Sequence, residues 1–163
     1  MKSRTTPHQE TILMKTLDYW FNTPLGKEAF ELECNRTERY LRDMPKGTIL
    51  QIGGPCLSHK PCDQRFEYIS VLPSASNQRK NTQIIASIES LPFDVGCFDL
   101  IIAPHAHEMV GQIDRWISQL HELLKPEGHL ILFGIRRYSL WWYQNSLSTK
   151  KPLFHWAKHL FSL

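Results

Sequence analysis

Two glycines follow a short apolar run in the stretch TILQIGGPC. Glycine has no Cβ, so a loop containing Gly53 and Gly54 lets a ligand approach the backbone and permits positive φ. The dinucleotide fingerprint G-x-G-x-x-G is missing because Pro-Cys-Leu follows the pair, and the chain has no phosphate loop ending in G-K-S/T. A ligand without phosphates therefore fits this loop better than a pyrophosphate, although a structural turn explains the pair equally well.

Titratable side chains gather in the stretch PHAHE, which follows the apolar run CFDLIIAP. Its members are His105, His107 and Glu108. Histidine titrates near neutral pH, so a general base or a metal pair would be chemically reasonable here. A structural role, or one beside a cofactor, explains the same residues more simply.

The four cysteines form no recognisable metal site. None stands in a C-x-x-C pair, and the spacing of Cys56, His59 and Cys62 matches no common zinc pattern. We therefore predict no metal ion, and free thiols in a reducing compartment.

Five short apolar runs predict the strands of a sheet. They lie at 48–52, 67–72, 83–88, 97–104 and 129–135. Few polar residues alternate within these runs, which is typical of parallel strands that are buried on both faces. The sequence therefore predicts an α/β fold with a Rossmann-like, doubly wound and mostly parallel sheet of about five strands.

Helical periodicity predicts two helices before the first strand and one between the last two strands. The first two cover residues 10–43 and are separated at Thr23-Pro24, where a capping residue precedes proline. The expected apolar stripe of the second helix is Leu25, Ala29, Leu32, Arg36 and Tyr40. That of the third helix is Ile113, Trp116, Ile117, Leu120 and Leu124.

The length of 163 residues fits a single domain. We divide it into N-terminal helices (1–46), a sheet core (47–136) and a C-terminal helical segment (137–163). The hydrophobic content of 42% and the formal charge of +3 are ordinary and name no partner. No apolar stretch is long enough to span a bilayer and the N-terminus lacks the core of a signal peptide, so we expect a cytoplasmic protein.

Three longer stretches, in their order and spacing, carry a family resemblance. They are LQIGG, SIESLPFDVGCFDLIIAPHAHEM and LHELLKPEGHLILFG. Together they resemble the class I S-adenosylmethionine-dependent methyltransferases, and within these the methyltransferase-11-like group, in a degenerate form. The leading YWFNTPLG and the trailing RRYSLWW resemble a bacterial subgroup, so the resemblance covers residues 18–142.

The resemblance implies a cofactor loop and a ribose site that departs from the family. Gln51, Gly53 and Gly54 stand at the positions of the cofactor loop, and Gln51 replaces the usual acid before the first glycine. Leu72, in VLPS, stands where the family places the carboxylate that binds the cofactor ribose.

The resemblance further implies contacts after the third and fourth strands. Ser87 replaces the acid that contacts adenine, Ile88 retains its backbone N–H, and Glu89 matches the family. Pro104 and His105 would flank the cofactor and face the substrate. No catalytic residue is expected, because methyl transfer from a sulfonium requires mainly alignment of the nucleophile with the methyl carbon.

The missing ribose acid predicts weak binding of S-adenosylmethionine. Each charge-assisted bond to a carboxylate contributes about 1.5–3 kcal/mol, and about 1.4 kcal/mol changes an affinity tenfold. We therefore expect a methyltransferase with weak cofactor binding and an acceptor that the sequence does not identify. A catalytically impaired module for binding or regulation, and a nucleic-acid-binding protein that uses the arginines and aromatics of RRYSLWW, are the alternatives.

The C-terminal segment is expected either to cover the edge of the sheet or to form an interface. Five strands can be read, and the closing strands of the family fold cannot, so we expect a truncated fold with an open sheet edge. The stripe of Leu153, Trp156 and Leu160 could shield this edge. Otherwise the edge invites a second copy of the chain or another protein partner.

Overall fold

The computed structural model of this chain describes residues 6–55, 64–74 and 82–134. The expectations for Cys56 and Cys62, for RRYSLWW and for the C-terminal stripe lie outside these residues. No helix in the described part is long and apolar enough to cross a membrane.

Five parallel strands form one sheet, in the order β3-β2-β1-β4-β5. The strands are β1 (Gly47–Ile52), β2 (Phe66–Leu72), β3 (Thr82–Ile85), β4 (Phe98–Pro104) and β5 (Leu124–Phe133). The helices are α1 (Pro7–Phe21), α2 (Pro24–Asp43) and α3 (Ile113–Leu123), with a short 3₁₀ turn, η1 (Ala106–Glu108), after β4. The predicted Rossmann-like parallel sheet is confirmed.

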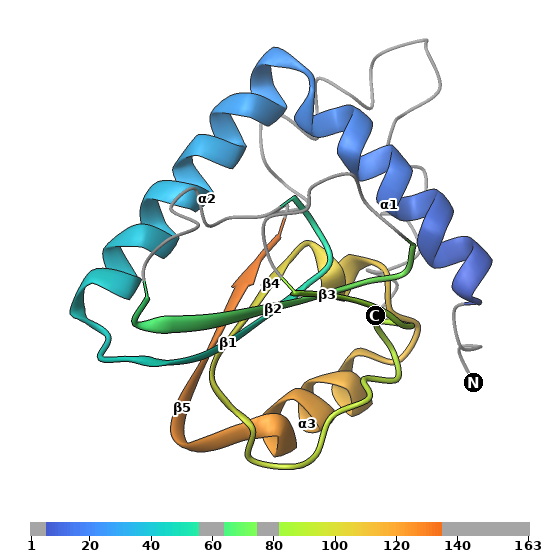
Figure 1. Cartoon of the computed structure of the whole chain (residues 1–163). Coiled ribbons are helices and arrows are strands. Elements are labelled where there is room, and N and C mark those ends of the chain that lie inside the picture. Colours follow the sequence, from blue (N-terminus) through green and yellow to red (C-terminus); the bar gives the residue numbers. More distant parts are fainter. Residues whose placement is uncertain (1–5, 56–63, 75–81, 135–163) are drawn as a thin grey trace, which may run out of the picture.

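The helices lie on both sides of this sheet (Figure 1). On one face, Cys34 and Leu41 of α2 share a core with Ile49, Leu100 and Ile102. On the other face, the core joins α3 and α1 to the alternate residues of β1 and β4. Because successive residues of a strand point to opposite faces, a strand buried on both faces supplies both cores.

A tight corner joins α1 to α2. Thr23 caps α2, its hydroxyl oxygen accepting from the Gly26 N–H at 3.1 Å and its hydroxyl donating to the Trp20 carbonyl at 2.7 Å. An added Cβ at Gly26 would lie 2.7 Å from the carbonyl carbon of Trp20. The close approach of the two helices therefore fixes the end of α1 against the beginning of α2.

The stripe expected for α2 is correct only in part: Ala29 and Tyr40 pack against the two cores, but the two leucines of the stripe do not. Leu25 and Leu32 are 42% and 58% exposed. The buried residues of the helix are Gly26, Cys34, Thr37 and Leu41. The helix is rotated relative to the expectation because the corner with α1 turns Gly26 inward. The residues on the same face of the helix as Gly26 therefore point toward the sheet.

Two element boundaries also differ from the expectation. The strand expected at 83–88 ends at Ile85, because the chain then turns and the Ser90 N–H donates to the Ser87 carbonyl at 3.2 Å. Helix α3 buries Leu123, while Leu124 already pairs with Phe98 as the first residue of β5. The residues between this pair and the regular ladder form an irregularity in the register.

Candidate functional site

The predicted site residues gather at the carboxyl edge of the sheet. Gln51, Leu72 and Pro104 lie in the last two residues of β1, β2 and β4. The others follow a strand: Gly53 and Gly54 follow β1, Ser87, Ile88 and Glu89 follow β3, and His105 follows β4. The order of the strands reverses between β1 and its neighbour β4. In open α/β sheets this switch point is where ligands bind.

Both glycines of the loop adopt positive φ, +67° at Gly53 and +65° at Gly54. A Cβ added at Gly54 would overlap the Pro104 ring, so this glycine is required by packing between the ends of β1 and β4. A Cβ added at Gly53 would meet the methyl groups of Met109 and Met14 at 3.3 and 3.5 Å. The space over Gly53 is therefore filled by flexible side chains, one of them from α1.

The side chain of Gln51 stabilises the loop from within. Its Nε2 donates to the carbonyls of Gly53 and Pro55, at 3.0 and 2.8 Å, and its Oε1 accepts from the Tyr68 hydroxyl at 2.5 Å. Gln51 is 2% exposed. In this arrangement, Gln51 supports the backbone of the loop.

Leu72, at the end of β2, is buried in the main core. Its carbonyl accepts from the Ala86 N–H at 3.1 Å, which ties the end of β2 to the end of β3. Its side chain offers no acceptor to a ribose hydroxyl.

The turn after β3 is held by an acid from α1. The Ser87 hydroxyl donates to Oε1 of Glu10 at 2.7 Å, and the Ile88 N–H donates to Oε2 at 3.2 Å. Glu10 is fully buried. Burial raises the pKa of its carboxyl above the usual value, although the two hydrogen bonds oppose that shift.

The other side of this turn is fixed by α3 and the loop before it. The indole N–H of Trp116 donates to the Ile88 carbonyl at 2.7 Å. Glu89 accepts from the Gly111 N–H at 2.6 Å, and its own N–H donates to the Ser87 hydroxyl at 3.2 Å. Both backbone groups of Ile88 are therefore bonded to side chains, its N–H to Glu10 and its carbonyl to Trp116.

His105 lies where β4, β5, α1 and α2 meet. Its Nε2 lies 3.0 Å from Oε1 of Glu33, and its Nδ1 lies 3.1 Å from Oε1 of Glu108. Its backbone N–H donates to the Phe133 carbonyl at 2.8 Å, and its φ is +57°. The rings of Trp20 and Phe21 contact the imidazole edge-on.

Two carboxylates on the two ring nitrogens make His105 an imidazolium, because both nitrogens must then donate. Burial alone would lower the pKa of His105, but the hydrogen bonds and charges of Glu108 and Glu33 outweigh it and raise the pKa to about 9. A ring protonated at neutral pH cannot act as a general base. Its chemistry here is that of a buried cation that connects α2 to the end of β4.

The neighbouring His107 packs against the residue that follows β5. Burial lowers its pKa, and its ring packs against Gly134, where an added Cβ would lie 2.6 Å from Nε2. Among the described residues, no group of three His, Cys, Asp or Glu side chains converges as a metal site. The structure therefore assigns PHAHE to packing and to the His105 ion pairs.

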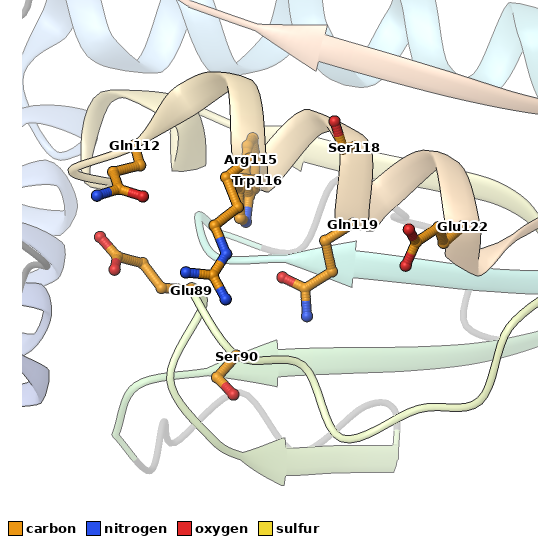
Figure 2. A pocket seen from close by; sticks show the side chains of 8 residues that line it. All are labelled: Glu89, Ser90, Gln112, Arg115, Trp116, Ser118, Gln119 and Glu122. Carbon is orange, nitrogen blue, oxygen red and sulfur yellow. The ribbon is translucent and has the colours of Figure 1, made fainter.

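A cavity of about 410 Å³ lies between α3 and the turn after β3 (Figure 2). Figure 2 shows the Arg115 guanidinium reaching into the space between the side chains of Glu89 and Gln119. The lining is polar and carries both signs of charge, and it includes Glu89 but no other predicted site residue. The cavity thus opens behind the turn and not above the glycine loop.

Two acids that shape this edge, Glu10 and Glu33, were not predicted. Each pairs with a residue more than seventy positions away, Glu10 with Ser87 and Ile88, and Glu33 with His105. Nothing in their helical surroundings distinguishes them from solvated acids, apart from the proximity of Glu10 to the capping residue Thr6.

The sequence model of the methyltransferase domain family (Methyltransf_11) matches residues 61–132. This match covers the turn after β3 and the end of β4, while the glycine loop precedes it. Among curated protein sequences, none matches the chain significantly.

Several solved structures that are described as methyltransferases share the fold of this chain. One from Thermotoga maritima, described as a possible histamine N-methyltransferase, has a TM-score of 0.67 and 20% identity over 90% of this chain and 72% of its own. A putative enzyme of Methanococcus maripaludis has 0.52 and 14%, over 73% and 61%. The 1,6-didemethyltoxoflavin-N1-methyltransferase of Burkholderia thailandensis, with its substrate and S-adenosylhomocysteine bound, has 0.50 and 12%, over 78% and 63%. The chain therefore spans from under two thirds to about three quarters of these relatives.

Proposed function

Because the chain has the fold and the domain of the class I S-adenosylmethionine-dependent methyltransferases, we propose that it binds this cofactor weakly and transfers its methyl group to an acceptor. The observation that carries the proposal is the glycine loop at the switch point between β1 and β4, beside the turn after β3. We place the activity in the cytoplasm. The acceptor is not identified by these features.

The residues at this edge fit such a cofactor in two respects. Gly53 presents backbone without a side chain, and the flexible ends of Met14 and Met109 above it can move aside. The Ile88 N–H is a backbone donor of the kind that a purine nitrogen accepts. Leu72 does not fit the ribose, because its buried side chain has no acceptor.

When bound, the cofactor supplies a methyl carbon on a sulfonium centre. The task of the protein is then alignment and exclusion of water, which a rigid loop and turn perform well. Gln51, itself bonded to Tyr68, holds the loop by its bond to the Gly53 carbonyl. Trp116 holds the turn by its bond to the Ile88 carbonyl. His105 remains protonated and keeps the helices in place, so we assign it no proton transfer.

Isothermal calorimetry with S-adenosylhomocysteine tests the proposal. We expect binding with a dissociation constant about two orders of magnitude weaker than with a ribose acid in place. Leu72→Asp should therefore tighten binding about a hundredfold, and Leu72→Asn, which has the same shape without the charge, should tighten it far less. Circular dichroism of each variant checks that the fold is retained.

Three outcomes would count against this proposal in different ways. Sub-micromolar binding by the natural chain would show that Leu72 costs little. Equal affinities of Leu72→Asp and Leu72→Asn would show that no ribose lies at the end of β2. The absence of binding at millimolar ligand would leave a methyltransferase-like module without a cofactor.

A further inference from the structure

The first half of α1 covers the carboxyl edge of the sheet at two separate points. Glu10 binds the hydroxyl of Ser87 and the N–H of Ile88. One turn later, the methyl carbon of Met14 lies 3.5 Å from the place that a Cβ on Gly53 would take. Both contacts use groups that the cofactor would need: the backbone donor of Ile88 and the open space above Gly53.

We propose that the first half of α1, residues 7–14, is a lid that competes with the cofactor for these contacts. With the lid closed, as in this structure, Glu10 takes the donors of the turn, and Met14 fills part of the space over the glycine loop, beside Met109. The cofactor binds only when this half of the helix moves away. The inference rests on the proposed function and concerns the regulation of the same site.

The second half of α1 is anchored and provides the fixed end of the lid. Trp20 and Phe21 are buried and contact the His105 ring. The Trp20 carbonyl accepts from the Thr23 hydroxyl, at the corner where Gly26 of α2 lies against it. A helix fixed in this way at its C-terminal end can release its first turns without unfolding the domain, because helix ends open locally at low cost.

The first half of α1 is held more weakly. Of its side chains described by the structure, Glu10 and Met14 are buried, whereas Ile12 is 51% exposed. Burying the Glu10 carboxylate is costly, as its raised pKa indicates, and the hydrogen bonds from Ser87 and from the backbone of the turn offset that cost only in part. The acid of Glu89 faces it from the turn and adds repulsion. Burial of this carboxylate therefore makes an unfavourable contribution to the closed position.

The prediction is that weakening the lid strengthens cofactor binding. Glu10→Ala removes both hydrogen bonds of the closed position, so the affinity for S-adenosylhomocysteine in calorimetry should rise about tenfold or more. Glu10→Gln, which keeps the shape and one acceptor, should give a smaller rise and guards against misfolding of the alanine variant. Lys15→Ala, on the exposed face of α1, is the matched control and should leave the affinity unchanged.

Amide hydrogen exchange without ligand gives a second readout. In Glu10→Ala, the Ile88 amide and the first turns of α1 should exchange faster, while Trp20 and Phe21 stay protected. In the natural chain, S-adenosylhomocysteine should produce the same release of residues 7–14.

The outcomes separate the lid from the proposed function. An affinity of Glu10→Ala equal to or lower than that of the natural chain would overturn the lid and leave the methyltransferase intact. No binding by any variant at millimolar ligand, together with faster exchange at Ile88, would overturn the proposed function and the competition with it.

Discussion

Raising the pH from 7 to 10 should remove the contribution of His105 to the stability of the folded chain. The folded protein holds the proton of His105 with a pKa of about 9, against the usual value of 6.5. The contribution is therefore fully present below pH 6.5 and is lost as the pH rises through 9. A difference of about 2.5 pKa units corresponds to about 3 kcal/mol, and burial of the ring leaves little solvent screening to reduce it.

Urea denaturation at several pH values, on the natural chain and on His105→Asn, measures this contribution. Asparagine carries no charge and tolerates the positive φ of this position. Thiols and tyrosines titrate in both proteins, so they cancel in the difference between the two free energies of unfolding. That difference should shrink by about 2.5 kcal/mol between pH 7 and 10, because a small part of the contribution is already lost at pH 7.

An NMR titration of the His105 ring provides the direct check. Its midpoint should lie near pH 9. A midpoint near 6.5, or a difference in unfolding free energy that stays constant from pH 7 to 10, would refute the reasoning. Either result would mean that Glu33 and Glu108 do not hold the second proton of the imidazole.

Two further predictions concern the glycine loop and the sheet edge. Gly54→Ala should lower the free energy of unfolding in urea by about 3 kcal/mol, because a Cβ would add overlap with Pro104 to the strain of positive φ. Gly53→Ala should lower it less. Gly96 has open space around it, so Gly96→Ala measures the strain of positive φ alone. Equal costs at the three glycines would contradict the packing argument. Deletion of residues 151–163 should either destabilise a monomer or dissociate an oligomer in light scattering, because β5 is the last strand of the described sheet. A monomer indifferent to the deletion would show that this segment neither covers the edge nor forms an interface.

Much of the fold could be predicted because it depends on local patterns. Short continuous apolar runs are typical of parallel strands that are buried on both faces, and the runs at β1, β2 and β4 lie within one residue of the observed strands. Thr23 and Pro24 mark the beginning of α2 by their own chemistry. The place of the glycine pair, directly after the first strand, follows from the sequence for the same reason.

The faces and ends of elements were harder to predict, because they depend on neighbours. The rotation of α2 follows from the contact of Gly26 with the end of α1. The early end of β3 follows from the turn that Glu10 and Trp116 hold. A hydrophobic pattern gives the period of a helix but not the direction from which its partner approaches.

The sequence by itself determined that the chain would form a parallel sheet, that a glycine loop would end its first strand, and that Leu72 would offer no ribose acceptor. Only the tertiary structure decided what the polar groups of that edge do. Glu10 came to lie on Ser87 and Ile88, and His105 became a buried cation between Glu33 and Glu108. The physical reason is that the type and period of an element depend on the local pattern of apolar residues, whereas an ion pair or a hydrogen bond between distant residues exists only after packing has brought them together.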